Sequence, residues 1–223
     1  MRHLIIIILF FLIVACKKTN AEFDGVNCSG NCYILTGKIV DTPSNNQIQG
    51  VELNFYYKPP SRMFDNTHYL GKTTTNAKGE YKFQFDGSNY KQNSGYFYIK
   101  GTKQDYFCNV QQDDIIGYFN LDSTQINDTT KQNFRMFKVS KLKVHYLVQN
   151  ITNFQFLTFS YGIGQSKQGW VFGGGKYDTT IEYITAKDIP TFIDWNALGN
   201  GVTIQKYDTL TATGTTLYYE VKL

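Results

Sequence analysis

The side chains that most often carry enzyme chemistry are scarce and scattered in this sequence. Histidine is the usual proton shuttle near neutral pH, and the chain has only three, His3, His68 and His145. His145 takes a polar position in an alternating stretch, where a solitary histidine is usually inert. No His-Glu-x-x-His, Cys-x-x-Cys or Gly-x-Ser-x-Gly motif occurs. We therefore expect no catalytic residue, no metal site and no cofactor.

A glycine run followed by lysine invites comparison with a phosphate-binding loop. The run is Gly173-Gly174-Gly175-Lys176, but that motif also requires an earlier glycine and a Ser or Thr directly after the lysine. Trp170 and Tyr177 occupy those two positions. The run is therefore interpreted as a hairpin turn between two strands.

The carboxylates offer one catalytic alternative. Asp86 and the pair Asp113-Asp114 lack the spacing of a calcium-binding loop, so we expect solvated turn residues. A hydrolase would instead build its site from Asp113, Asp114 and Asp194. That hypothesis requires two of these carboxylates to lie ~5–10 Å apart across a cleft.

The first residues predict export. Arg2 and His3 precede eleven apolar residues, Leu4 to Val14. A spanning helix needs about 20 apolar residues, whereas this run has the length of a secretion-signal core. It ends in Ile-Val-Ala-Cys at 13–16, which resembles the lipobox of bacterial lipoproteins. The resemblance implies a signal peptide over residues 1–15 that is cleaved, acylation of Cys16, and the lipid bilayer as a partner.

Residues 16–31 are mostly polar and are expected to act as a tether between the lipid and a folded body. Lipoproteins exported to the cell surface carry an acidic run after the lipidated cysteine, and none follows here. The resemblance therefore implies the cell envelope, with an outer-membrane anchor and the periplasmic side favoured over the cell surface. The alternative is a plain secretory leader with Cys16 incidental and Asn27, Asn127 and Asn150 as glycosylation acceptors.

Three further cysteines remain after Cys16: Cys28, Cys32 and Cys108. An oxidising compartment permits a disulfide, but three thiols cannot all pair. Cys28 and Cys32 could bridge as a small clip at the start of the first strand, or one of them could tie the tether to Cys108.

Hydrophobic alternation with a period of two predicts an all-β chain. Apolar residues alternate with polar ones over 51–58, 80–85, 141–149 and 216–223. The best helical candidate lies near Ala186 to Leu198, where Pro190 keeps it short. Strands are expected over 33–41, 49–58, 68–75, 79–86, 95–101, 116–121, 133–149, 154–163, 169–172, 177–185, 202–208 and 215–222.

This number of short strands predicts two antiparallel β-sandwiches, over 32–139 and 140–223. The first contains Leu-Thr-Gly-Lys-Ile-Val-Asp at 35–41 and Gly-Lys-Thr-Thr-Thr-Asn-Ala-Lys-Gly-Glu-Tyr-Lys-Phe at 71–83. It resembles the carboxypeptidase regulatory-like domain, a transthyretin-like, Ig-like sandwich, over about residues 32–107. Asn76 replaces the usual Asp of that pattern, and Glu52 stands where a small residue is common. Asn76 can make the same side-chain-to-backbone turn bond as Asp, and Gly79 supplies a positive φ, so a tight hairpin turn is expected over 76–79. The resemblance implies an accessory, scaffold or adhesion module without catalysis.

Aromatic side chains supply the remaining functional hint. The chain has 17 Tyr and 17 Phe, and alternating strands cannot bury every one. Trp170 and Tyr161 are candidates for stacking on a ligand, although cross-strand pairing explains exposed aromatics as well. The formal charge of +4 is spread without a basic stripe, so no nucleic-acid partner is expected.

The sequence thus predicts a membrane-anchored, non-catalytic binding, adhesion or structural module. Its partner in the envelope would be a protein or a glycan. The alternatives are a carbohydrate-binding accessory protein and, less favoured, the hydrolase described above.

Overall fold

The computed structural model confirms an all-β fold: its described residues form strands and turns and contain no helix. The described residues are 28, 30, 32–59, 67–87, 95–110, 114–119, 129–149, 155–199 and 201–223.

The described residues form fifteen strands. Those of the N-terminal half are β1 (Cys32–Thr42), β2 (Glu52–Lys58), β3 (His68–Thr74), β4 (Glu80–Asp86), β5 (Tyr96–Thr102), β6 (Tyr106–Phe107), β7 (Ile115–Phe119) and β8 (Thr129–Lys131). They are followed by β9 (Phe134–Val148), β10 (Phe156–Ile163), β11 (Ser166–Gly173), β12 (Tyr177–Ala186), β13 (Pro190–Gly199), β14 (Val202–Thr211) and β15 (Thr216–Lys222).

The strands form three sheets. Two are four-stranded and antiparallel, in the orders β3-β2-β5-β7 and β11-β10-β13-β14. The third has the order β12-β9-β1-β4, with β15 and β6 also paired to β9 and β8 paired to β1. This third sheet is mixed, because β1 and β15 both run parallel to β9.

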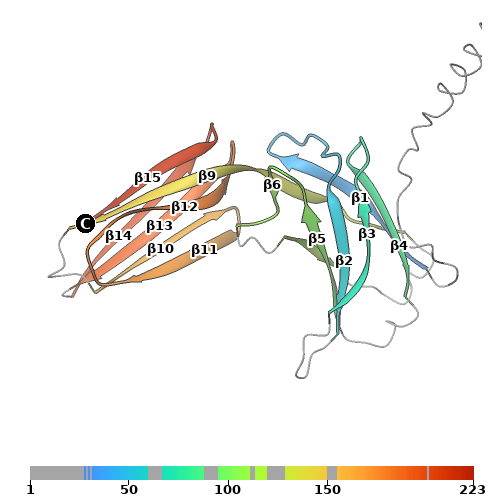
Figure 1. The fold of residues 1–223 in the computed structure, drawn as a ribbon, viewed down its shortest axis with the longest axis horizontal. Helices are drawn as coiled ribbons and strands as arrows, with labels where there is room; N and C mark the ends of the chain where they lie inside the picture. Colours follow the sequence, from blue (N-terminus) through green and yellow to red (C-terminus); the bar gives the residue numbers. More distant parts are fainter. Residues whose placement is uncertain are drawn as a thin grey trace, which may run out of the picture.

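The long strand β9 belongs to both halves of the molecule (Figure 1). Its first residues pair with β1, and residues from Val139 onward pair with β12. The predicted boundary at 139/140 therefore falls inside a continuous strand. Phe107 and Val110, from the N-terminal side of that boundary, belong to the C-terminal core.

Two hydrophobic cores lie between the sheets, one in each half. In β1 every second residue is buried, which is the pattern of a strand with one face on a core. Across the N-terminal core the rings of Phe55 and Phe83 stack at 3.8 Å with an angle of 7°. The C-terminal core lies between β12-β9-β15 and β11-β10-β13-β14, and aromatic rings fill much of it.

The predicted helix near Ala186 to Leu198 is wrong. Residues 190–199 form β13, a central strand that pairs with β10 and β14. Thr191, Ile193, Trp195 and Ala197 alternate into the core, which a helix with 3.6 residues per turn could not achieve. Pro190 is tolerated because it is the first residue of the strand. The short strands β6 and β8 were also outside the expected set.

The turn at Asn76 matches the expected bonding but not the expected hairpin. The Oδ1 atom of Asn76 accepts hydrogen bonds from the main-chain N–H groups of Lys78 and Glu80, both at 2.9 Å. The strands on either side do not pair, because β3 joins β2 in one sheet and β4 joins β1 in the other. The motif therefore makes a corner between two sheets. The glycine run at 173–175 likewise links strands of different sheets, β11 and β12.

The geometry of this corner predicts that the stability of the fold is sensitive to substitution of Gly79. Its φ is +65°, and a Cβ atom there would lie 2.7 Å from the carbonyl oxygen of Ile39. Gly79→Ala should lower the free energy of unfolding by about 1–3 kcal/mol, measured by urea denaturation. The matched control is Gly214→Ala, because a Cβ at Gly214 meets nothing within 4 Å; equal losses for the two variants would contradict the assignment.

Candidate binding site

The two aromatic residues predicted to stack on a ligand lie on the inner face of their sheet. Tyr161 is only 1% exposed, and its ring is parallel to that of Trp170, with centroids 5.7 Å apart and an angle of 4°. Both rings also contact Tyr183 in the C-terminal core. They stack on each other and on the core, so the ring of Tyr161 is not open to stacking by a ligand.

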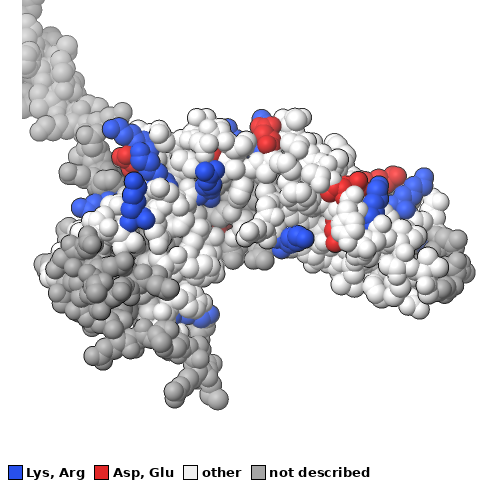
Figure 2. Space-filling model, turned by 180° about the vertical axis from the view of Figure 1, so that it is seen from behind, with Lys and Arg blue, Asp and Glu red and all other residues white. Residues whose placement is uncertain are grey.

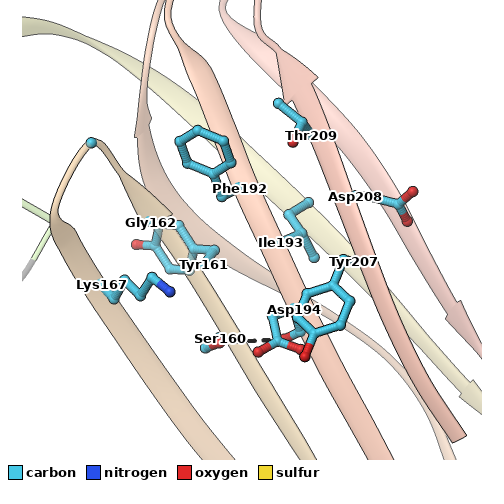
Figure 3. A pocket seen from close by; sticks show the side chains of 11 residues that line it. Ser160, Tyr161, Gly162, Lys167, Phe192, Ile193, Asp194, Tyr207, Asp208 and Thr209 are labelled. Atoms are coloured by element: carbon cyan, nitrogen blue, oxygen red, sulfur yellow. Dashed lines mark hydrogen bonds between the residues drawn. The ribbon is translucent and has the colours of Figure 1, made fainter.

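The opposite, outer face of the sheet β11-β10-β13-β14 is hollowed (Figure 3). The hollow has a volume of about 480 Å³. Its lining residues come from all four strands and one turn: Ser160, Tyr161, Gly162, Gly164, Lys167, Phe192, Ile193, Asp194, Tyr207, Asp208 and Thr209.

The register of the four strands brings the outward side chains together in two neighbouring rows. In one row, Ser160 is opposite Asp194, which in turn is opposite Tyr207. In the other, Gly162 lies between Lys167 and Phe192. Residues two apart on a strand share a face, so the two rows form one surface. No sequence motif links these residues, because they are separated by up to 47 positions (207 minus 160).

Gly162 and Ser160 lie at the floor of the hollow. The floor is closely packed at Gly162, where an added Cβ would clash with the main-chain oxygen of Ser166 and sit 2.8 Å from Lys167 Cγ. The aromatic side chains Phe192 and Tyr207 are 46% and 67% exposed. They provide apolar surface beside the polar floor.

Asp194 is the most informative polar group of the hollow. Its Oδ1 atom is buried and has no hydrogen-bond donor among the described residues. A buried acceptor without a donor costs about 1–3 kcal/mol, and a ligand hydroxyl or amine would relieve this cost only after a rotation of the Asp194 side chain exposed the atom. The ammonium group of Lys167 extends toward the hollow (Figure 3), so the surface offers both a donor and an acceptor. Asp208 points away from it (Figure 3) and accepts a hydrogen bond from the Tyr219 hydroxyl.

The hollow lacks the arrangement of a nucleophile with its base. The Ser160 hydroxyl donates to the main-chain oxygen of Asp194 at 3.4 Å. No histidine lines the hollow. The groups present can donate, accept and stack, which is the chemistry of binding.

The carboxylates of the hydrolase hypothesis are not brought together in the part of the chain that the structure describes. Asp113 lies outside the described residues, and Asp86 ends β4. Asp114 lines a different hollow from that of Asp194, beside Lys103 and Tyr106. Within the described ranges no group of three or more His, Cys, Asp or Glu residues is placed to hold a metal ion.

The cysteines follow one of the two expected arrangements. Cys28 and Cys32 form a disulfide with their Cα atoms 5.8 Å apart. Cys108 keeps its thiol, which donates to the carbonyl oxygen of Gly101 at 3.3 Å. Cys16 lies outside the described residues. Among the described residues no helix is long and apolar enough to cross a membrane.

A second polar surface covers the outer face of β12-β9-β15. His145 lies between two carboxylates there, with Nε2 3.0 Å from Asp178 Oδ1 and Nδ1 3.4 Å from Glu220 Oε2. Lys141 pairs with Glu182 at 2.7 Å on the same face. Acidic and basic side chains intermix in this way over the view in Figure 2, without a continuous patch of one sign.

Comparisons with known proteins give little further information. No family model and no curated protein matches the chain. Solved structures that resemble it include the Bacillus anthracis TIE protein, with 14% identity and a TM-score of 0.36 over 86% of this chain and 34% of that one. The Lactobacillus rhamnosus GG shaft pilin SpaA shows 9% identity and a TM-score of 0.33 over 86% and 97% of the two chains.

A streptococcal ancillary pilin shows 12% identity and a TM-score of 0.32 over 88% of this chain and 63% of that one. This chain spans about a third of the length of the TIE protein. Scores this low carry no argument about function.

The His145 cluster predicts a measurable titration. The hydrogen bond to Asp178, helped by Glu220, raises the pKa of His145 above its ordinary value. Its stabilising contribution is therefore present below pH ~6.5 and is lost as the pH rises through the raised pKa. NMR titration should show Asp178→Asn lowering this pKa. The control is Glu182→Gln, because Glu182 pairs with Lys141 and Lys143 on the same face rather than with His145. An unchanged His145 pKa in Asp178→Asn would contradict the assigned pair.

Proposed function

We propose that this chain is a lipid-anchored protein of the bacterial envelope that acts as a non-catalytic binding module. The observation that carries the proposal is the hollow on β11-β10-β13-β14, where the exposed aromatic rings of Phe192 and Tyr207 lie beside polar lining residues. Such a site holds a ligand by stacking and hydrogen bonding.

The anchor and the site lie at opposite ends of the chain. The leader and the lipobox-like cysteine precede a polar stretch, and the hollow is built from residues 160–209. A tether between lipid and body would leave the C-terminal half accessible to ligands in the periplasm. A module that faces the cell surface would use the same site.

Carbohydrate binding is the more specific candidate. A sugar ring presents apolar C–H faces and hydroxyl groups at its edge, and Phe192 and Tyr207 lie next to Ser160, Asp194 and Lys167. The aromatic rings suit the faces, and the polar side chains suit the hydroxyls. The hydrolase alternative gains no support, because Asp114 and Asp194 line different hollows.

The anchor is tested by replacing its cysteine. Full-length protein from a bacterial host should partition into the detergent phase of Triton X-114, and its mature amino terminus should carry acyl chains by mass spectrometry. Cys16→Ser should move to the aqueous phase, because acyl chains contribute ~0.8 kcal/mol per buried CH₂ to membrane binding. Cys108→Ser is the control and should stay in the detergent phase. An unmodified Cys16 in the native protein would refute the anchor.

The hollow is tested by titration calorimetry of the detergent-solubilised protein against a panel of mono- and disaccharides. Asp194→Asn should weaken binding about ten- to a hundredfold, since it removes a charged acceptor, and Tyr207→Ser should weaken it about tenfold. Tyr218→Ser alters an exposed tyrosine of the other sheet and should leave binding unchanged. Absence of binding across the panel, or equal affinity of Asp194→Asn and the natural chain, would refute a sugar site here.

A further inference from the structure

A row of four tyrosines crosses the outer face of the N-terminal sheet β3-β2-β5-β7. Tyr69, Tyr56, Tyr98 and Tyr118 occupy directly opposed positions, one on each strand. Their positions in the sequence span 62 residues (118 minus 56), from Tyr56 to Tyr118, so only strand pairing brings them together. We call these four residues the tyrosine row.

The rings of the row are in contact from one edge of the sheet to the other. The centroid of Tyr56 lies 5.5 Å from that of Tyr69 and 5.0 Å from that of Tyr98, and Tyr98 lies 6.4 Å from Tyr118. Tyr96 adds a fifth ring, 5.7 Å from Tyr118 and 6.2 Å from Tyr98. Because adjacent strands are ~4.8 Å apart, the row extends over about 14 Å.

These rings account for the exposed large hydrophobic surface of the described N-terminal half. Tyr69, Tyr96 and Tyr118 are 55%, 41% and 60% exposed, and the other exposed large hydrophobic side chains of the described residues all lie in the C-terminal half. Contiguous exposed aromatic surface of this kind marks interaction sites. Cross-strand pairing explains the contacts inside the row, but it does not require the outer rings to remain open to solvent.

Polar groups border the row and complete its chemistry. Asn54 accepts a hydrogen bond from the Tyr69 hydroxyl at 3.4 Å and donates to Glu52 at 3.0 Å. Lys100 is opposite Asn54 on β5, and Lys72 pairs with Glu52 at 3.3 Å. Burial raises the pKa of Tyr56, so its hydroxyl stays protonated at neutral pH and can donate.

We infer that the tyrosine row binds an extended polysaccharide chain that lies across the four strands. Tyrosine combines an apolar ring with a hydroxyl, which matches the apolar faces and hydroxyl edges of pyranose sugars. Protein–protein interfaces are enriched in Tyr, Trp, Phe and Met together, whereas the exposed large hydrophobic residues of the described N-terminal half are all tyrosine, each with a hydroxyl that can bond to a sugar. Five rings in contact exceed the size of one sugar, so a chain fits better than a monosaccharide.

The tyrosine row needs no rearrangement to bind a polysaccharide. Each ring projects from a paired strand rather than a loop, so little conformational freedom is left to lose on binding. The row lies on a different sheet from the hollow at Asp194. The inference therefore stands whether or not that hollow binds sugars.

The test uses full-length protein in detergent and a panel of polysaccharides: chitin, cellulose, xylan, alginate and purified peptidoglycan. Retention is measured by pull-down for the insoluble members and by affinity gel electrophoresis for the soluble ones. We expect retention by at least one member. Tyr69→Ser and Tyr118→Ser should each weaken it about two- to tenfold, and the double variant by about the product. These end positions are chosen because their side chains are the most exposed of the row.

Tyr218→Ser is the matched control, because this tyrosine is 71% exposed on the other half of the molecule. It should bind like the natural chain. Retention by no member of the panel, or equal retention of the natural chain and the double variant, would overturn the inference.

A second measurement does not depend on the folding of the variants. Nitration of the natural chain by tetranitromethane is followed by peptide mass spectrometry with and without the retained polysaccharide. Tyr69 and Tyr118 should be protected and Tyr218 should not. Equal nitration of Tyr69 and Tyr118 in both conditions would overturn the inference, even if a saccharide bound in the hollow at Asp194.

Discussion

The pairing of β9 is the constraint on which the rest of the structure depends. Its first residues pair in parallel with β1, residues 137–138 pair with β6, and residues 139–148 pair with β12 while β15 lies on its other edge. The main-chain groups of one fifteen-residue strand therefore hold sheets in both halves. Phe107 and Val110 add apolar contacts on the C-terminal side of this junction. The two halves are therefore joined through one continuous strand.

Alternation along the strands of the C-terminal half places some aromatic side chains in the core and others on the outer face. Tyr161 and Trp170 point inward from β10 and β11 and stack against Tyr183, where burial of ring area stabilises the sandwich. Tyr207 points outward from β14 beside Asp194. A shift of one residue in either strand would exchange these faces. Register therefore decides which tyrosines are structural and which can meet a ligand.

The two outer faces have different characters. The C-terminal face is hollowed beside Ser160 and Gly162, and it contains a carboxylate. The N-terminal face is a row of tyrosine rings in contact, bordered by Asn54 and Lys100. The first suits a small polar ligand and the second suits an extended chain. Both are built on paired strands, so both keep their geometry without a ligand.

Local chemistry made much of this fold readable from the sequence. Period-two alternation marked most of the strands, since it reports one buried face whatever the partner strand. Asn76 and Gly79 marked a turn, because the bonds to Lys78 and Glu80 and the positive φ are local properties. The lipobox-like residues before Cys16 are equally local, and they rest on the sequence alone.

Only the tertiary structure decided how strands are shared between sheets. The sequence suggested hairpins at 76–79 and 173–175, yet each joins two sheets, because pairing partners are chosen by packing rather than by the turn. The helical candidate lay near Ala186 to Leu198, but two neighbouring strands make residues 190–199 a central strand of a sheet. The hollow at Asp194 and the tyrosine row could not be foreseen for the same reason. Their residues are distant in the chain, and a single sequence carries no record of which strands become neighbours.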